Sequence, residues 1–209
     1  MSKGFAIFFF TVVLFLFVTN ASAQNYIEQT LAQREIYKQA FLTDEHAPLR
    51  EEDLKDLRFF EPDSLYRVIA ELTFIHDEQP FIIPTYSGKE KKYLRFAEAN
   101  FEIKGEPVKL TLFKSVALIN NPQYDDYLFL PFTDPTNDKD TYGGGRYLDL
   151  KRSAIKGNQL IIDFNLAYNP YCAYSEGYNC PIPPLENALE IPIEVGEKKF
   201  TGLQKDRRH

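Results

Sequence analysis

The feature that most constrains the fold is a period of two in the apolar residues that follow Leu65. Every second position is apolar, at Tyr66, Val68, Ala70, Leu72 and Phe74. Side chains on a strand point alternately to opposite faces, so this period predicts a strand with one buried face.

Further strands are predicted at 81–86, 91–97, 100–104, 108–114, 127–132, 146–150, 159–164 and 189–195. Tight turns with the sequences SGKE, AEAN and KGEP separate several of them, and no helical pattern intervenes. Short strands joined by tight turns pair antiparallel. The sequence therefore predicts an all-β fold, mainly an antiparallel barrel or curved sheet sandwich, with an N-terminal helix outside it or over one end.

That N-terminal helix is predicted at residues 26–42. One broad arc of its helical wheel, expected to face inward, holds Tyr26, Ile27, Thr30, Leu31, Tyr37, Phe41 and Leu42. Arg34 and Lys38 intrude on this arc. A shorter helical turn is predicted from Pro48, with Leu54 and Leu57 pointing inward.

The first 23 residues have the pattern of a secretory signal peptide. Lys3 supplies a positive start, residues 5–18 are largely apolar, and Ala21-Ser22-Ala23 forms a small-x-small cleavage site. An uncleaved anchor is the alternative, but the apolar run is short for a membrane span. We therefore expect a single domain at residues 24–209, exported to the periplasm or the extracellular space.

Composition narrows the classes of partner. The formal net charge is −6 and no basic stripe is present, which argues against nucleic acid and against an anionic membrane surface after signal cleavage. The three histidines, His46, His76 and His209, have no metal-binding spacing. We expect neither a metal nor another cofactor.

Residues 127–187 hold the chain's most unusual composition, with a triple glycine, both cysteines and many Tyr, Asn, Asp and Pro residues. The ordered motifs PFTD, TYGGGRYLDL, DFN, AYNP, CAY, CP, PP and EN resemble those of an uncharacterised bacterial family known only as a domain of unknown function. The segment from Thr43 through Leu49 and on to DSLYRV resembles the upstream part of its shorter, exported members. This resemblance implies a shared fold and a shared site, but no activity.

We interpret the loops of residues 134–187 as the walls of a polar pocket with aromatic sides. The candidate ligand-binding residues are Tyr142, Arg146, Asp163, Asn165, Tyr168, Asn169, Tyr174, Glu186 and Asn187. Each has a structural alternative. The asparagines could cap backbone groups, and the tyrosines could cover the core with their hydroxyls at the surface.

Arg146 follows the triple glycine Gly143–Gly145. No Gly-Lys-Ser/Thr follows the glycines and no helix is predicted there, so a bend in the chain is favoured over a phosphate loop. Arg146 could clamp a carboxylate or a phosphate, or pair structurally with Asp134, Asp149 or Asp163.

Cys172 and Cys180 are the only cysteines. Two cysteines close together in an exported protein predict a disulfide. A catalytic cysteine and a zinc site are the alternatives, and both lack a nearby histidine.

Two functions from different classes remain open. The preferred hypothesis is a secreted binding domain for a small or extended ligand. The alternative is an extracytoplasmic hydrolase that uses Asp163 or Glu186 as acid or base while Arg146 orients an anionic group. A third possibility is that the whole motif is structural.

Overall fold

The structure, a computed structural model, describes residues 24–76 and 79–205. The predicted signal peptide at residues 1–23 lies outside the described residues. Within the described part, no helix combines the length and the apolar character that crossing a membrane requires.

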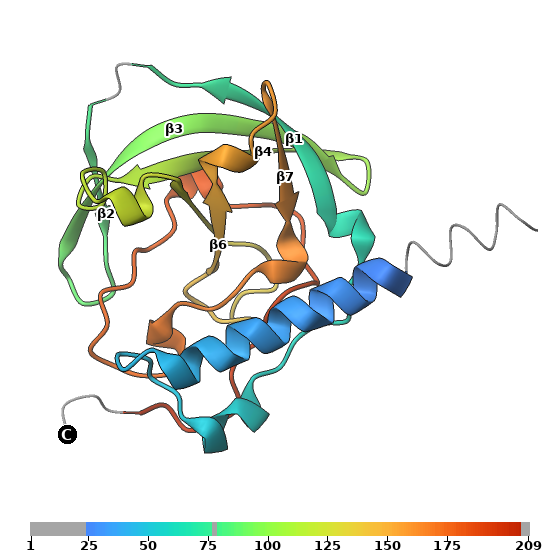
Figure 1. The fold of residues 1–209 in the computed structure, drawn as a ribbon, viewed down its shortest axis with the longest axis vertical. Coiled ribbons are helices and arrows are strands. Elements are labelled where there is room, and N and C mark those ends of the chain that lie inside the picture. The colour runs from blue at the N-terminus through green and yellow to red at the C-terminus, as the bar shows by residue number, and fades with distance from the viewer. Residues whose placement is uncertain (1–23, 77–78, 206–209) are drawn as a thin grey trace, which may run out of the picture.

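A seven-stranded antiparallel sheet forms the body of the protein and curls into a half-barrel (Figure 1). The main strand order is β6-β5-β4-β3-β1-β7, with β2 paired to β3. The strands are β1 (Arg67–Phe74), β2 (Phe81–Pro84), β3 (Glu90–Ile103), β4 (Glu106–Ser115), β5 (Tyr127–Phe132), β6 (Arg146–Lys151) and β7 (Gln159–Asp163). This architecture confirms the predicted fold class.

The period of two decides which side chains fill the half-barrel. Val68, Ala70 and Leu72 of β1 are buried, and they pack with inward residues of the other strands in one large cluster. Leu128 and Leu130 of β5 belong to the same cluster. The predicted alternation thus corresponds to the inner face of the sheet as far as Leu72. Phe74 was predicted to be buried as well, but it is 37% exposed at the end of β1.

Two of the sequence predictions were wrong in detail. The predicted AEAN turn does not exist, because β3 runs unbroken through it with only a register shift between Arg95 and Ala97. Ala97 and Ala99 stay buried on the inner face there, so the alternation continues where we expected a turn. A bulge takes up the irregularity without ending the strand.

Residues 189–195 do not form the predicted strand. Pro192 has no amide proton to give to a sheet. The carbonyls of Ile193 and Val195 instead accept hydrogen bonds from the Arg146 side chain. The amide of Ile193 donates to Asp134, and the amide of Leu189 donates to the carbonyl of Thr133, just past the end of β5. This segment is therefore fixed by the Arg146 and Asp134 side chains and by a backbone contact beside β5, without forming a strand of the sheet.

The predicted N-terminal helix is confirmed and spans residues 24–43 of the described part. Thr30, Arg34 and Phe41 are buried on one of its faces, while the expected inward residues Leu31 and Leu42 are exposed. Arg34 is buried because it donates to the carbonyl of Phe60 and its guanidinium stacks on a neighbouring ring. The helix lies across the body on the side where β6 and β7 are seen (Figure 1).

Short 3-10 turns complete the fold. The turn expected from Pro48 is η1, and Leu57 just after it is buried as predicted. The turns are η1 (Glu51–Asp56), η2 (Ser64–Tyr66), η3 (Pro122–Tyr124), η4 (Arg152–Ala154), η5 (Phe164–Leu166), η6 (Tyr171–Ala173) and η7 (Leu185–Asn187).

Candidate functional site

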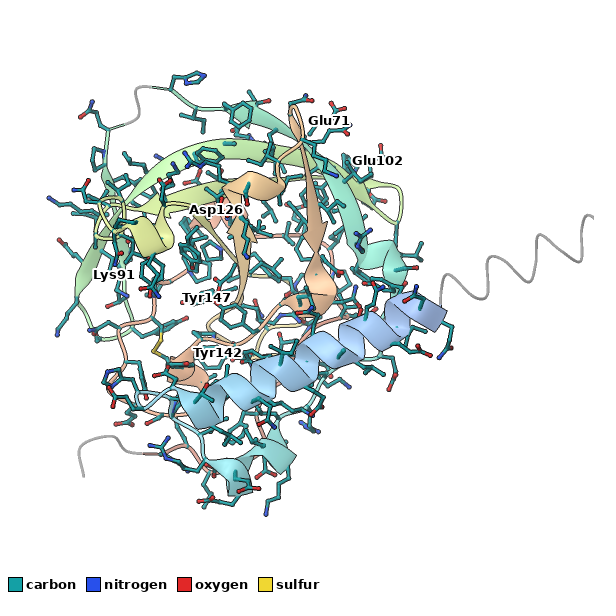
Figure 2. All side chains as sticks on the ribbon, viewed as in Figure 1. Glu71, Lys91, Glu102, Asp126, Tyr142 and Tyr147 are labelled. Atoms are coloured by element: carbon teal, nitrogen blue, oxygen red, sulfur yellow. A yellow bond between two sulfur atoms is a disulfide. The ribbon has the colours of Figure 1, made fainter. Side chains whose placement is uncertain are left out.

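A cavity of about 810 Å³ lies where the two edge strands of the half-barrel face the N-terminal helix. Strand β6 contributes the four consecutive residues 147–150, and β7 contributes Ile161 and Asp163. Tyr37 and Ala40 come from the helix. Figure 2 shows Tyr147 in the space between β6 and this helix. The curl of the sheet and the helix thus create the cavity together.

Asp149 is a charged residue in the cavity lining whose two carboxylate oxygens differ in their contacts. Its Oδ1 accepts hydrogen bonds from the hydroxyls of Tyr127 and Tyr168, each at 2.8 Å. Among the described residues, its second oxygen, Oδ2, accepts none. Asp149 therefore has one oxygen fixed by the protein and one available to a ligand.

The environment of Asp149 alters its acidity. Burial raises the pKa of the Asp149 carboxyl, and the hydrogen bonds from Tyr168 and Tyr127 counteract part of that rise. The residue is nevertheless accessible to solvent. The two observations are compatible, because a concave cavity admits water while protein surrounds the carboxylate on most sides.

Aromatic rings form much of the cavity wall. The rings of Tyr147 and Tyr168 meet edge to face, with centroids 5.9 Å apart and planes at 87°. The ring centroid of Tyr37, on the helix, lies 5.9 Å from that of Tyr168. A second cavity, of about 650 Å³, shares Tyr147 and Tyr168 with the first and is also lined by Tyr127 and Phe129. The two cavities therefore share these tyrosines in their linings.

Three other charged residues line the main cavity. Asp163 accepts a hydrogen bond from Tyr26 at 3.0 Å and lies 3.8 Å from Nε of Arg67. Asp163 also caps η5 by accepting from the amide of Asn165. Lys91 is the third, and burial lowers its pKa. Asp163 is thus already partnered within the protein.

The predicted disulfide is present in the structure. Cys172 and Cys180 are bonded, with their Cα atoms 6.2 Å apart. Cys180 and Pro181 line the cavity, and Pro181 accepts a hydrogen bond from the hydroxyl of Tyr147. Tyr171 in the same loop donates to Asp44, just past the helix. The disulfide therefore closes a loop that forms one wall of the cavity.

The structure brings only some of the predicted site residues together. Asp163 and Tyr168 line the cavity. Arg146 does not, because its side chain is fully buried and pairs with Asp134 at 2.9 Å. Of the partners considered for Arg146, the structure thus selects Asp134.

Each of the three candidate asparagines forms hydrogen bonds with backbone groups of residues that lie next to it in the fold. Asn165 accepts from the amide of Asp63 and donates to its carbonyl, and Asn187 makes the same pair of bonds to Thr111. Asn169 donates to the carbonyl of Lys198. All three asparagines are fully buried. Their contacts agree with the structural alternative, in which the asparagines cap backbone groups.

The remaining candidates lie apart from the cavity lining. Glu186 pairs with Arg95 at 2.9 Å and accepts from the hydroxyl of Thr111. The ring of Tyr142 lies 6.3 Å from that of Tyr86. Tyr174 is fully buried and donates to Glu197 at 2.6 Å. The contacts of Glu186, Tyr142 and Tyr174 described here are with other residues of the protein.

The triple glycine forms a bend immediately before β6. Gly145 has φ +83°, a conformation that disfavours other residues, and a Cβ there would lie 2.6 Å from the carbonyl oxygen of Phe132. The expected bend is therefore present. Among residues 24–76 and 79–205, no group of three His, Cys, Asp or Glu side chains is placed to hold a metal ion.

Glu197 is a buried carboxylate that the sequence analysis missed. It accepts hydrogen bonds from Tyr37 at 2.9 Å, from Tyr174 at 2.6 Å and from the amide of Asn169 at 2.9 Å. Burial raises its pKa to about 7, although these hydrogen bonds act in the opposite direction. No local sequence signal identifies Glu197, because its partners are distant in the chain.

Comparison with known proteins places this architecture in a family. The family model described as a protein of unknown function (DUF1684) matches residues 52–198. The solution NMR structure of an uncharacterised protein from Haloarcula marismortui is similar, with a TM-score of 0.64 and 33% sequence identity over 86% of this chain and 97% of that one. No curated protein matches the chain. The chain therefore belongs to the DUF1684 family of proteins of unknown function.

Proposed function

We propose that the protein binds a small organic ligand in the cavity between β6, β7 and the N-terminal helix. The observation that carries this proposal is the Asp149 carboxylate, which opens into a cavity of about 810 Å³ with one oxygen held by two tyrosines. Small-molecule sites are concave and mostly apolar, with a few placed polar groups. The cavity has both properties.

The lining also favours a ligand with an apolar body. Ile161 and Leu166 line the cavity and are 44% and 40% exposed, which is unusual for large apolar side chains grouped around a hollow. A bound ligand would cover them. We propose that the apolar part of the ligand packs there while its polar part contacts Asp149.

We further propose that the protein acts outside the cytoplasm. The disulfide between Cys172 and Cys180 supports export, because such bonds persist in oxidising compartments. The signal-peptide pattern at residues 1–23 points the same way.

Hydrolysis is a second candidate, favoured by the presence of two carboxylates in one cavity. The raised pKa of Asp149 suits a general acid, and Asp163 lines the same cavity in a more strongly hydrogen-bonded setting. Of the residues first considered for this chemistry, Asp163 remains in the candidate, whereas Arg146 and Glu186 lie outside the cavity lining.

Filling the cavity tests the binding proposal. Ala40 lines the cavity from an exposed position on the helix, so Ala40→Trp should occupy the hollow without disturbing the core. A screen of small amphipathic molecules by ligand-observed NMR should give hits with the unmodified protein that disappear with this variant. Ala32→Trp, at another exposed position of the same helix outside the cavity lining, is the matched control and should retain them. Hits that survive Ala40→Trp would show that binding occurs elsewhere.

A further inference from the structure

The charge of Asp149 is the starting point of this inference. Among the described residues, no ion pair includes this carboxylate. Two cations, Arg67 and Lys91, line the same cavity. Arg67 lies 3.8 Å from Asp163, and Asp149 is not within ion-pair distance of either cation. The cavity therefore contains a negative charge that the protein leaves uncompensated.

The causes of the pKa shift of Asp149 agree with its distance from Arg67 and Lys91. Its pKa responds to burial and to the hydroxyls of Tyr168 and Tyr127, and to neither of the two cations. Both hydroxyls donate to Oδ1. They hold the carboxylate in place and leave Oδ2 open to a donor or a cation from outside.

The aromatic walls suit the same kind of ligand. Tyr168 donates to Asp149, and its ring meets that of Tyr147 at 87° to form a corner that lines the cavity. Electron-rich ring faces attract organic cations, most strongly when water is excluded. A carboxylate beside such a corner combines two attractions for one positive charge.

We propose that the cavity binds an organic cation, a substituted ammonium group that lies beside Oδ2 of Asp149 and against the rings of Tyr147 and Tyr168. The apolar body of this ligand extends over Ile161 and Leu166. The inference rests on the proposed binding function and adds the chemical class of the ligand. A carboxylate or phosphate ligand would instead place its charge beside an uncompensated anion.

Three probes of nearly the same shape but different charge test the class of ligand. They are choline, its uncharged carbon analogue 3,3-dimethylbutan-1-ol, and the anion 3,3-dimethylbutanoate. Dissociation constants come from NMR titration of the unmodified protein. We expect choline to bind at least about tenfold more tightly than the alcohol, since a desolvated cation on aromatic rings gains that much or more. The amide signals of residues 148–150 should shift on titration.

Asp149→Asn keeps the size of the side chain and removes its charge. We expect this variant to bind choline and the alcohol with equal strength. Glu98→Gln removes one negative charge outside the cavity and should keep the preference for choline. The titration of the unmodified protein decides the question even where Asp149→Asn folds poorly.

The outcomes separate the two proposals. Equal binding of the three probes, with shifts at residues 148–150 that Ala40→Trp abolishes, would keep the cavity as a binding site and overturn the cationic class. Tighter binding of the anion would overturn it as well. If no probe binds, the cationic class is rejected, while hits from the broader screen that Ala40→Trp abolishes would still support the binding function.

Discussion

The hydroxyl of Tyr37 lies 2.9 Å from Oε2 of the buried Glu197, and this contact joins the N-terminal helix to the last part of the domain. The hydroxyl of Tyr174 lies 2.9 Å from that of Tyr37 and donates to the other oxygen of Glu197. Because Tyr37 also lines the cavity, Glu197 contacts the wall of the candidate site through this hydroxyl.

Stability should depend on pH through Glu197. Its pKa rises from an ordinary value of 4.5 to about 7 in the folded protein, so the folded state binds more protons than the unfolded state between those values. The free energy of unfolding should therefore fall as pH rises from 4.5 to about 7. Glu197→Gln should flatten this slope in denaturant titrations at a series of pH values. Glu194→Gln, at an exposed position, should leave the slope unchanged, and an equal slope in both variants would contradict the assignment.

Arg146 should be a major source of stability. Arg146→Ala would leave Oδ2 of the buried Asp134 and the carbonyls of Ile193 and Val195 without their donor, and would remove the cation that pairs with Asp134. Breaking one partner of a buried pair costs roughly 3–5 kcal/mol. Arg152→Ala, which breaks an exposed pair with Asp125, should cost less than about 1 kcal/mol in the same urea titration. Similar losses in the two variants would contradict a structural role specific to Arg146.

Loss of the disulfide should loosen the cavity wall before it unfolds the sheet. Replacing both cysteines, Cys172→Ser with Cys180→Ser, removes a constraint worth about 2.5 kcal/mol by loop entropy. Amide hydrogen exchange should accelerate first at residues 171–181. Thiol titration of the denatured, unreduced protein should find no free thiol, and two reactive thiols would show that the bond does not form.

The mature protein should begin at Gln24, directly after the small-x-small site Ala21-Ser22-Ala23. Intact mass of protein recovered from the envelope or the medium measures this directly. A product that keeps residues 5–18 in a membrane fraction would contradict cleavage.

Local patterns in the sequence predicted the strands well. The alternation at Val68, Ala70 and Leu72 predicted the inner face of the sheet, and the resemblance to a family of unknown function is confirmed. That the motifs quoted from residues 127–187 form the core of that family remains a prediction. Residues 189–195 were mistaken for a strand because apolar residues alternate along them. In the structure, this alternation buries Ile193 and Val195 in a segment that is not a strand and that Arg146 binds.

The cavity was harder to predict, because it depends on contacts between distant parts of the chain. In the sequence analysis, Asp149 was considered only as a possible partner of Arg146. Its importance comes from Tyr127 on the neighbouring strand and from Tyr168 in a later loop. The ligand-binding role of the candidate residues named from the sequence stays a prediction. Two of these residues, Asp163 and Tyr168, line the cavity.

The contact between Tyr37 and Glu197 spans 160 residues of sequence, and that between Tyr37 and Tyr174 spans 137. Contacts so distant in sequence form late, because the intervening chain must first be ordered. A ribosome makes the helix first, yet the residues that anchor it are among the last of the domain to be made. We therefore expect nascent chains that end before Glu197 to lack the contacts that anchor the helix against the rest of the cavity wall.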